Sequence, residues 1–103
     1  MKRIMLVCAA GMSTSLLVTK MQAAAREAEG LEAEIFAVSA TEADERLADT
    51  NAPVDVLLLG PQVRYMQNEF ETKLTIPVAV IDMRDYGTMN GEAVLKTALE
   101  LMK

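Results

Sequence analysis

The chain has 103 residues, of which 51% are hydrophobic and 24% charged, and its formal net charge is −5. This length and balance predict one soluble globular domain over residues 1–103 and exclude a disordered chain. The acidic charge and the lack of a Lys/Arg run exclude a nucleic-acid-binding protein, because that function requires clustered cations.

The N-terminal segment starts with the basic residues Lys2 and Arg3, followed by an apolar run that is too short for a signal peptide or a membrane span. Residues 4–8 of this run are Ile-Met-Leu-Val-Cys, directly before a glycine-containing loop. Such an unbroken run predicts a strand that is buried on both faces of a sheet. Cys8 is the chain's single cysteine and cannot form an internal disulfide. We therefore expect a reduced, cytoplasmic protein that is not embedded in a membrane.

Helical and edge-strand patterns follow this first strand. Apolar residues recur at helical spacing and predict a helix over about residues 14–29, which ends at Gly30. Residues 32–38 partly alternate between apolar and polar side chains, as in an edge strand that is wet on one face. Thr41 and Asp44 resemble a capping box, so we expect a short helix after them.

The second half of the chain repeats the alternation of strands and helices. Residues 54–59 and 78–81 are apolar and predict the third and fourth strands. Pro61 suits the first turn of a third helix, and Asn90 suits the N-cap of a last one. The predicted inner face of the third helix consists of Val63, Met66, Phe70 and Leu74, and that of the last helix consists of Val94, Leu95, Ala98, Leu101 and Met102.

The order of elements is therefore βαβαβαβα, which predicts an α/β fold with a parallel sheet and helices on both faces. The two fully apolar strands, the first and the third, are expected to be central neighbours, giving the strand order 2-1-3-4. Such a sheet is flavodoxin-like and similar to that of low-molecular-weight tyrosine phosphatases. Ligands bind to such sheets beyond the carboxyl ends of the strands, where the winding direction reverses. This prediction brings Cys8 and the loop after it to the switch point.

The loop after Cys8 combines three features that suit a reactive thiol and a bound phosphate. The start of a helix favours a thiolate, because unpaired N–H groups and the helix dipole stabilise negative charge. The small residues Ala9, Ala10 and Gly11 allow successive backbone N–H groups to converge on an anion. The hydroxyl residues that follow, Ser13, Thr14 and Ser15, add donors.

The same residues also have a purely structural interpretation. A cysteine at the end of an apolar strand is often a packed core residue, and the hydroxyl residues 13–15 are also typical helix caps. The coincidence of cysteine, glycine-bearing loop, hydroxyl cluster and helix start at a predicted switch point favours the reactive site.

Two motifs resemble a known family over essentially the whole chain. Residues 8–18, Cys-Ala-Ala-Gly-Met-Ser-Thr-Ser-Leu-Leu-Val, are followed by Lys20-Met21, and residues 58–62, Leu-Leu-Gly-Pro-Gln, are followed by Tyr65-Met66. These motifs resemble the IIB component of the lactose/cellobiose (chitobiose) branch of bacterial sugar phosphotransferase systems. The resemblance implies a phosphotransferase that carries a phosphoryl group between two partner proteins.

The resemblance also implies the roles of individual residues and partners. Cys8 accepts phosphate from a phosphohistidine of the IIA component and donates it to a sugar, expected to be a β-linked disaccharide, bound by the membrane component IIC. The implied phosphate cradle consists of Ala10, Gly11, Met12, Ser13, Thr14 and Ser15. The chain has no histidine, so the phosphohistidine has to belong to another protein. We expect a monomer without a cofactor or a metal ion.

Other functions of a cysteine loop after the first strand remain as alternatives. A low-molecular-weight cysteine phosphatase would have an arginine six residues after the nucleophile, where this chain has Thr14, although Asp82 or Asp85 could act as its general acid. A thiol redox protein would need a partner to resolve an oxidised Cys8, because no second cysteine exists. A flavodoxin-like binding module has few aromatic residues here to stack a flavin.

Several residues that follow the third and fourth strands are expected to border the crevice beside Cys8 or to contact a partner. We expect Tyr65 to be exposed, because it lies off the apolar face of its helix. Met12, at the crest of the first loop, is a further candidate for a partner contact. The candidate residues after the two strands are Gln62, Arg64, Tyr65, Asp82 and Tyr86.

Overall fold

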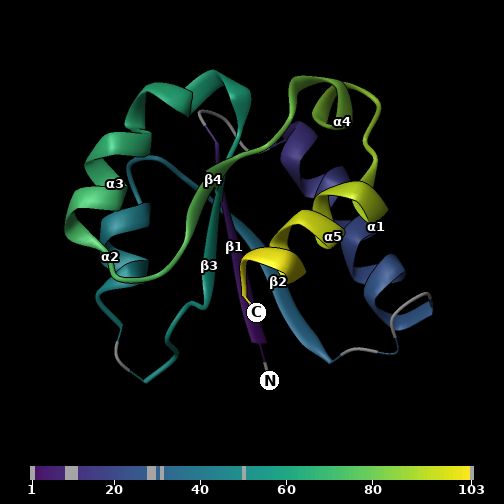
Figure 1. Ribbon diagram of the computed structural model, residues 1–103, viewed down its shortest axis with the longest axis horizontal. Helices are drawn as coiled ribbons and strands as arrows, with labels where there is room; N and C mark the ends of the chain where they lie inside the picture. The colour runs from purple at the N-terminus through teal and green to yellow at the C-terminus, as the bar shows by residue number, and fades with distance from the viewer. Residues whose placement is uncertain (1, 9–11, 28–29, 31, 50, 103) are drawn as a thin grey trace.

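The computed structural model describes residues 2–8, 12–27, 30, 32–49 and 51–102, with the backbone alone for residues 12–14. Strands and helices alternate along this part of the chain (Figure 1). In chain order the elements are β1 (Lys2–Cys8), α1 (Met12–Glu27), β2 (Ala33–Ser39), α2 (Ala43–Leu47), β3 (Val56–Leu59), the 3₁₀ helix η1 (Pro61–Met66), α3 (Gln67–Lys73), β4 (Val78–Val80), α4 (Met83–Gly87) and α5 (Gly91–Leu101).

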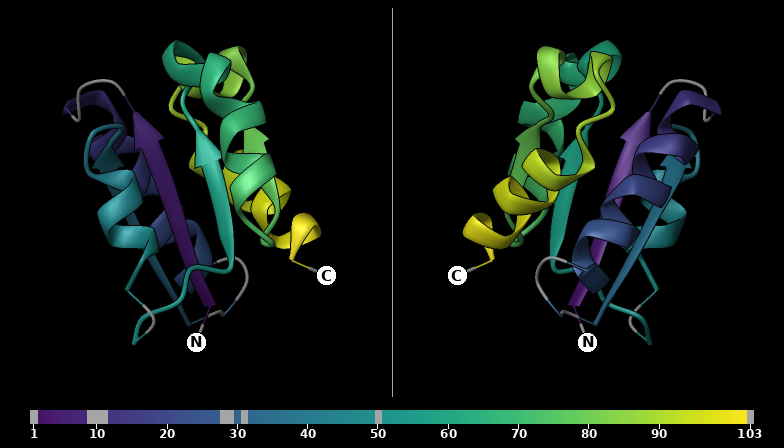
Figure 2. Two further views of the ribbon diagram at one scale, coloured as in Figure 1. Left: turned by 90° about the vertical axis from the view of Figure 1, so that its left-hand side faces the viewer. Right: turned by 90° about the vertical axis from the view of Figure 1, so that its right-hand side faces the viewer.

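The four strands form one parallel sheet in the order β2-β1-β3-β4, which confirms the predicted topology. Helices α2 and α3 cover one face of the sheet, and α1 and α5 cover the other (Figure 1). The left view of Figure 2 looks onto the first of these faces and the right view onto the second. All four strands point toward the same edge of the molecule, where α1, η1 and α4 begin.

The central strand β1 explains why its sequence is apolar without alternation. Ile4 and Leu6 pack into the cluster that contains α1 and α5 residues, whereas Met5 and Val7 pack into the cluster on the α2 and α3 side. All four residues are 0% exposed. A strand with helices on both faces has no side that can tolerate a polar residue, because neither face contacts water.

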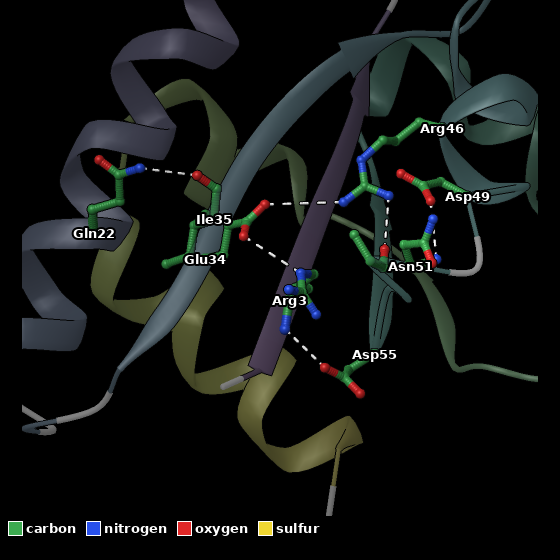
Figure 3. Close-up of polar contacts among 9 residues, drawn as sticks. Arg3, Gln22, Glu34, Ile35, Arg46, Asp49, Asn51 and Asp55 are labelled. Atoms are coloured by element: carbon green, nitrogen blue, oxygen red, sulfur yellow. Dashed lines mark hydrogen bonds and ion pairs between the residues drawn. The ribbon is translucent and has the colours of Figure 1, made fainter.

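Side chains from α1, β1 and α2 contact β2 (Figure 3). Gln22 of α1 donates a hydrogen bond from Nε2 to the carbonyl oxygen of Ile35, at 2.9 Å. Glu34 forms ion pairs with Arg3, at 3.4 Å, and with Arg46, at 3.9 Å. The Gln22 hydrogen bond occupies a backbone carbonyl of the edge strand that would otherwise be open to pairing with another chain.

The start of α5 packs unusually closely against the middle of α1. An ideal Cβ on Gly91 would lie 2.6 Å from the backbone carbon of Lys20 and 2.6 Å from the backbone nitrogen of Met21. Only glycine fits this contact. The helix begins there because the Asn90 side chain accepts a hydrogen bond from the backbone N–H of Ala93, at 3.1 Å, which confirms the predicted N-cap.

The predicted element boundaries are close to those observed. Each strand differs from its predicted bounds by one or two residues. Helix α1 begins at Met12, two residues before the predicted start, and the predicted end at residues 28–29 lies outside the described residues. Gly30 has a φ of +56°, the left-handed conformation that suits a glycine just after a helix.

The predicted capping box at Thr41 and Asp44 is wrong. Helix α2 begins at Ala43, and the residue before it, Glu42, makes no side-chain capping hydrogen bond. The Thr41 hydroxyl instead lies 3.0 Å from the Ser39 hydroxyl, which itself lies 2.8 Å from Glu42 Oε1. The Thr41 hydroxyl is thus hydrogen-bonded to Ser39 at the end of β2 and does not cap α2.

The third helix is interrupted, unlike the continuous helix predicted. Val63 has non-helical angles of −119° and 22°, which separate the η1 turn from α3. Val63 and Phe70 are buried, whereas Met66 and Leu74 are only partly buried. Pro61 occupies the first turn, as predicted.

We predict that Gly91→Ala lowers the free energy of unfolding by about 1–3 kcal/mol, because the added methyl group forces α5 away from the α1 backbone. Urea unfolding followed by circular dichroism measures this loss. Gly87→Ala is the matched control, since an ideal Cβ on Gly87 meets no atom within 4 Å. Equal unfolding midpoints for the two variants would contradict the proposed steric role of Gly91.

Candidate functional site

Cys8 is the last residue of β1, at the point where the winding of the sheet reverses. The chain runs from β1 to β2 on one side and then continues with β3 on the other side of β1. Val7 pairs with Leu59 of β3, and Cys8 pairs with Ser39 of β2. The strand order therefore confirms that Cys8 lies at the switch point, where parallel α/β sheets bind ligands.

The Cys8 thiol is free and almost completely buried, with the residue 1% exposed. Its Sγ lies 3.8 Å from the carbonyl oxygen of Val38, to which the S–H group donates. The Cys8 carbonyl oxygen accepts a hydrogen bond from the backbone N–H of Ala40, at 2.9 Å. These contacts fix the thiol against the end of β2 and shield it from bulk water.

The predicted phosphate cradle lies only partly within the described residues. Ala10 and Gly11 lie outside them, as do the side chains of residues 12–14, whose backbone forms the first turn of α1. Ser15 is exposed, and its carbonyl oxygen accepts a hydrogen bond from Thr19 Oγ1, at 3.1 Å. Helix α1 thus starts four residues after Cys8, and its first N–H groups have no carbonyl partners within the helix.

The loop after β3 brings Gly60 next to Cys8 and the Gln62 carboxamide next to Gly60. An ideal Cβ on Gly60 would lie 3.8 Å from Cys8 Cβ and 3.3 Å from Gln62 Oε1. Both side chains therefore lie against Gly60, which supports the prediction that Gln62 borders the site. Sequence reasoning noted Gly60 only as part of a motif, because its proximity to Cys8 depends on the strand register.

Three large apolar side chains are more than half exposed at this edge of the sheet. They are Leu16 of α1, at 51%, Tyr65 of η1, at 78%, and Met83 of α4, at 65%. Each belongs to the element that follows a strand at the edge that contains Cys8 (Figure 1). The exposure of Tyr65 confirms the prediction, whereas Leu16 and Met83 were missed because their sequence patterns do not distinguish exposed from packed apolar residues.

Arg64 lies in the same turn as Tyr65 and is exposed. Its guanidinium donates a hydrogen bond from an Nη atom to the Pro61 carbonyl oxygen, at 3.2 Å. Arg64 therefore lies along η1, where it adds positive charge to the surface that contains Tyr65.

Asp82 begins α4, a short helix that the sequence analysis did not predict. Its carboxylate accepts hydrogen bonds from the backbone N–H groups of Arg84, at 2.8 Å, and Asp85, at 3.3 Å. Asp82 therefore acts as an N-cap, and its Oδ1 atom is already occupied by backbone donors. This geometry argues against Asp82 as a general acid.

Tyr86 does not border an open crevice, contrary to the prediction. It is 9% exposed and packs in the same core cluster as Val94 and Leu95 of α5. The one-turn helix α4 directs Tyr86 inward, whereas an extended loop was assumed at this position. Its role is to attach α4 to the core.

A cavity of about 430 Å³ lies elsewhere, between β2 and α2. It is lined by Val38, Glu42, Glu45, Arg46 and Asp49. The carboxylates repel a phosphoryl group, and the single cation among them, Arg46, already hydrogen-bonds the Ala52 carbonyl oxygen, at 2.8 Å. This cavity is therefore not a phosphate site.

Among the described residues, no group of three or more His, Cys, Asp and Glu side chains could hold a metal ion. None of the helices in that part of the chain has the length and hydropathy needed to cross a membrane.

The chain is similar in sequence to one family of known proteins. A family model for the lactose/cellobiose-specific IIB subunit of the PTS system matches residues 3–97. The chain is 55% identical to the PTS system galactose-specific EIIB component of Lactococcus lactis subsp. cremoris, covering 98% of this chain and 96% of that protein. It is 54% identical, with the same coverage, to the PTS system cellobiose-specific EIIB component of Lactococcus lactis subsp. lactis. It is 43% identical to the oligo-beta-mannoside-specific EIIB component of Bacillus subtilis, covering 99% of this chain and 97% of that protein.

Two solved structures are similar to the whole chain. The solution structure of the cellobiose-specific phosphotransferase IIB component from Borrelia burgdorferi has a TM-score of 0.77 and 36% identity, and the match covers 98% of this chain and 91% of that one. The lactose-specific IIB component domain from Streptococcus pneumoniae has a TM-score of 0.79 and 18% identity, covering 99% and 98%. The second similarity demonstrates a shared fold.

We predict that Asp82→Ala lowers the free energy of unfolding by about 1 kcal/mol, because it removes the N-cap of α4. Asp82→Asn keeps a carbonyl oxygen in the same position and should retain most of the stability. Urea unfolding of both variants measures the difference. Losses of equal size for Ala and Asn would contradict the capping role and would point to the carboxylate charge instead.

Proposed function

The chain belongs to the lactose/cellobiose-specific IIB subunits of sugar phosphotransferase systems, and we propose that it is the phosphoryl carrier of such a system, with phosphate carried on Cys8. The observation that carries this proposal is the position of the single cysteine, buried at the switch point of the sheet, four residues before α1. We further propose that the chain forms one IIB domain and works in the cytoplasm.

The proposed reaction has two transfers, and each exchanges one bond to phosphorus. In the first, the Cys8 thiolate attacks the phosphorus of a phosphohistidine on IIA, so that an S–P bond forms while the N–P bond breaks. The electron pair of that bond returns to the imidazole nitrogen, and the imidazole takes up a proton that balances the one lost by the Cys8 thiol. In the second, a sugar hydroxyl bound by IIC attacks the phosphorus, the S–P electron pair returns to sulfur, and the hydroxyl proton leaves to a base or solvent.

The surroundings of Cys8 suit storage of a phosphoryl group between these two transfers. Burial of the sulfur limits the access of water, and the first N–H groups of α1 supply donors at the same edge of the sheet. A phosphatase would place an arginine at position 14, where this chain has threonine, and would need a free general acid. The Asp82 carboxylate already caps α4, and without an arginine at position 14 hydrolysis is less well supported than transfer.

We propose that IIA and IIC dock in turn on one surface around Cys8, because both must reach the same sulfur. The exposed side chains of Leu16, Tyr65 and Met83 support this surface. Apolar and aromatic side chains are enriched at the centres of protein interfaces. The transported sugar is proposed to be a β-linked disaccharide, the class of sugar to which cellobiose belongs.

We predict that Cys8→Ser abolishes phosphorylation by a cognate IIA, because it removes the soft nucleophile while changing little volume. The protein is incubated with phosphoenolpyruvate, the general phosphotransfer proteins and IIA, and its intact mass is measured with and without thiol alkylation. An unchanged urea midpoint serves as the control for folding. Phosphate on the Cys8→Ser variant, or on another residue of the unmodified chain, would contradict the assignment of Cys8 as the phosphorylated residue.

We predict that Tyr65→Ser and Met83→Ser each raise the KM for phosphorylated IIA by about fivefold with little change in stability, since truncating an exposed interface anchor costs about 1 kcal/mol or more. Steady-state transfer rates measure this effect. Lys96→Ala, an exposed change on α5, is the control and should leave KM unchanged. Unaltered KM in both apolar variants would exclude these side chains from the docking surface.

A further inference from the structure

Gly60 leaves a position without a side chain directly beside Cys8. Val7 and Leu59 are paired neighbours in β1 and β3, so the residues that follow them, Cys8 and Gly60, also lie side by side. The ideal Cβ on Gly60, at 3.8 Å from Cys8 Cβ, would point to the same face of the sheet as the cysteine. Any larger residue would place its side chain next to the sulfur, whereas glycine leaves this space for another group.

The carboxamide of Gln62 reaches into this space. Its Oε1 atom lies 3.3 Å from the ideal Cβ position on Gly60. The Gln62 side chain is exposed and makes no hydrogen bond that involves the described residues. A primary amide has two N–H donors as well as its oxygen. The carboxamide next to Gly60 therefore has donors that no other described residue occupies.

The backbone around Gly60 holds Gln62 in this place. The Gly60 N–H donates to the Val7 carbonyl oxygen, at 2.8 Å, and the Gly60 carbonyl oxygen accepts from the Val63 N–H, at 3.0 Å. Pro61, which is buried, fixes the first turn of η1. This tight turn brings residue 62 back over residue 60, so the approach of Gln62 to the site is a property of the fold and not of a long, freely moving loop.

We propose that Gln62 binds the phosphoryl group carried on Cys8, with Nε2 donating a hydrogen bond to a phosphoryl oxygen. This inference rests on the proposed function, because it requires phosphate on that sulfur. The terminal torsion of glutamine is broad and roughly two-fold, so a half-turn exchanges Oε1 for Nε2 at the same position. The phosphoryl oxygens are strong acceptors that carry negative charge, which makes such a bond stronger than one between neutral groups.

A neutral donor fits the requirements of a carrier. The phosphoryl group must be stable enough on sulfur to survive until a partner docks, yet it must leave readily to a sugar. A bidentate arginine contributes a full positive charge and would retain the phosphate more strongly. The carboxamide of Gln62 stabilises the phosphorylated state through a hydrogen bond and carries no charge that would oppose release of the phosphate.

The test is the equilibrium of phosphoryl exchange between IIA and this protein. Purified phosphorylated IIA is mixed with the unphosphorylated chain, and intact masses of both proteins are measured after exchange is complete. The equilibrium constant depends only on the free energies of the separated proteins. A residue that merely contacts IIA alters the exchange rate but leaves this constant unchanged, so the measurement separates phosphate binding from docking.

We predict that Gln62→Met lowers this equilibrium constant by about tenfold, the size expected for a lost hydrogen bond to a charged group. Gln62→Glu should lower it at least as much, because a carboxylate repels the phosphoryl oxygens. Gly60→Ala should act in the same direction, since its methyl group displaces the Gln62 carboxamide from the position 3.3 Å away. Gln67→Met, in α3, is the matched control and should leave the constant within twofold of the unmodified value.

A second readout is independent of IIA. The side-chain ¹⁵N–H signals of Gln62 should shift when Cys8 is phosphorylated, and those of Gln67 should not. Urea midpoints verify that the variants are folded. If Cys8 of the unmodified chain is phosphorylated but Gln62→Met has an unchanged equilibrium constant and the Gln62 signals do not move, the inference about Gln62 is wrong and the proposed function stands. If Cys8 of the unmodified chain takes no phosphate, the proposed function itself fails.

Discussion

The burial of β1 on both faces is the constraint on which the rest of the structure depends. From Ile4 to Val7, successive side chains alternate between two separate cores and are 0% exposed. Burying a large apolar side chain stabilises a protein by about 1.5–3 kcal/mol, so this one strand contributes much of the stability that a domain of this size possesses. The strand has no freedom to shift or to turn, because a displacement by one residue would exchange the two cores. Cys8, the next residue, is therefore held in a position that is determined by the core rather than by the loop.

Two glycines then determine what can lie around that end of the sheet. Gly91 lets α5 approach the backbone of α1, and so fixes the helix whose first turn follows Cys8. Gly60 lies beside Cys8 itself and admits the Gln62 carboxamide in place of a side chain of its own. At both positions the absence of a Cβ leaves room for another part of the chain. This role can be recognised only in the folded structure, where β1 meets β3 and α1 meets α5. Glycine in these positions matters through close packing rather than through an unusual backbone conformation.

The sequence predicted the sheet and its order because both depend on strong local patterns. The apolar runs of β1 and β3, the N-cap Asn90 and the exposure of Tyr65 could each be inferred from a few neighbouring residues, and they agree with the structure. Helix α4 and the burial of Tyr86 were missed, because a one-turn helix has too few residues for periodicity and depends on the cap at Asp82. The proximity of Gln62 and Gly60 to Cys8 depends on strand register, which no local pattern reveals. The assignments of the loop residues 9–11 remain predictions, since these residues lie outside those described.

Under the proposed function, a balance between holding and releasing a phosphoryl group accounts for the neutral residues Gly60 and Gln62 near Cys8. Gln62 presents a neutral carboxamide next to Gly60, whereas Arg64 hydrogen-bonds the Pro61 carbonyl oxygen and Asp82 caps a helix. Neutral donors act only over hydrogen-bond distances, whereas a full charge near the sulfur acts over several ångströms and would stabilise one protonation or phosphorylation state strongly. A carrier works best when its loaded and empty states differ little in free energy, because a deep minimum at either state stops the next transfer. The buried Cys8 thiol, next to Gly60, suits this condition, and position 14 holds threonine in place of the arginine that would clamp phosphate in a hydrolase.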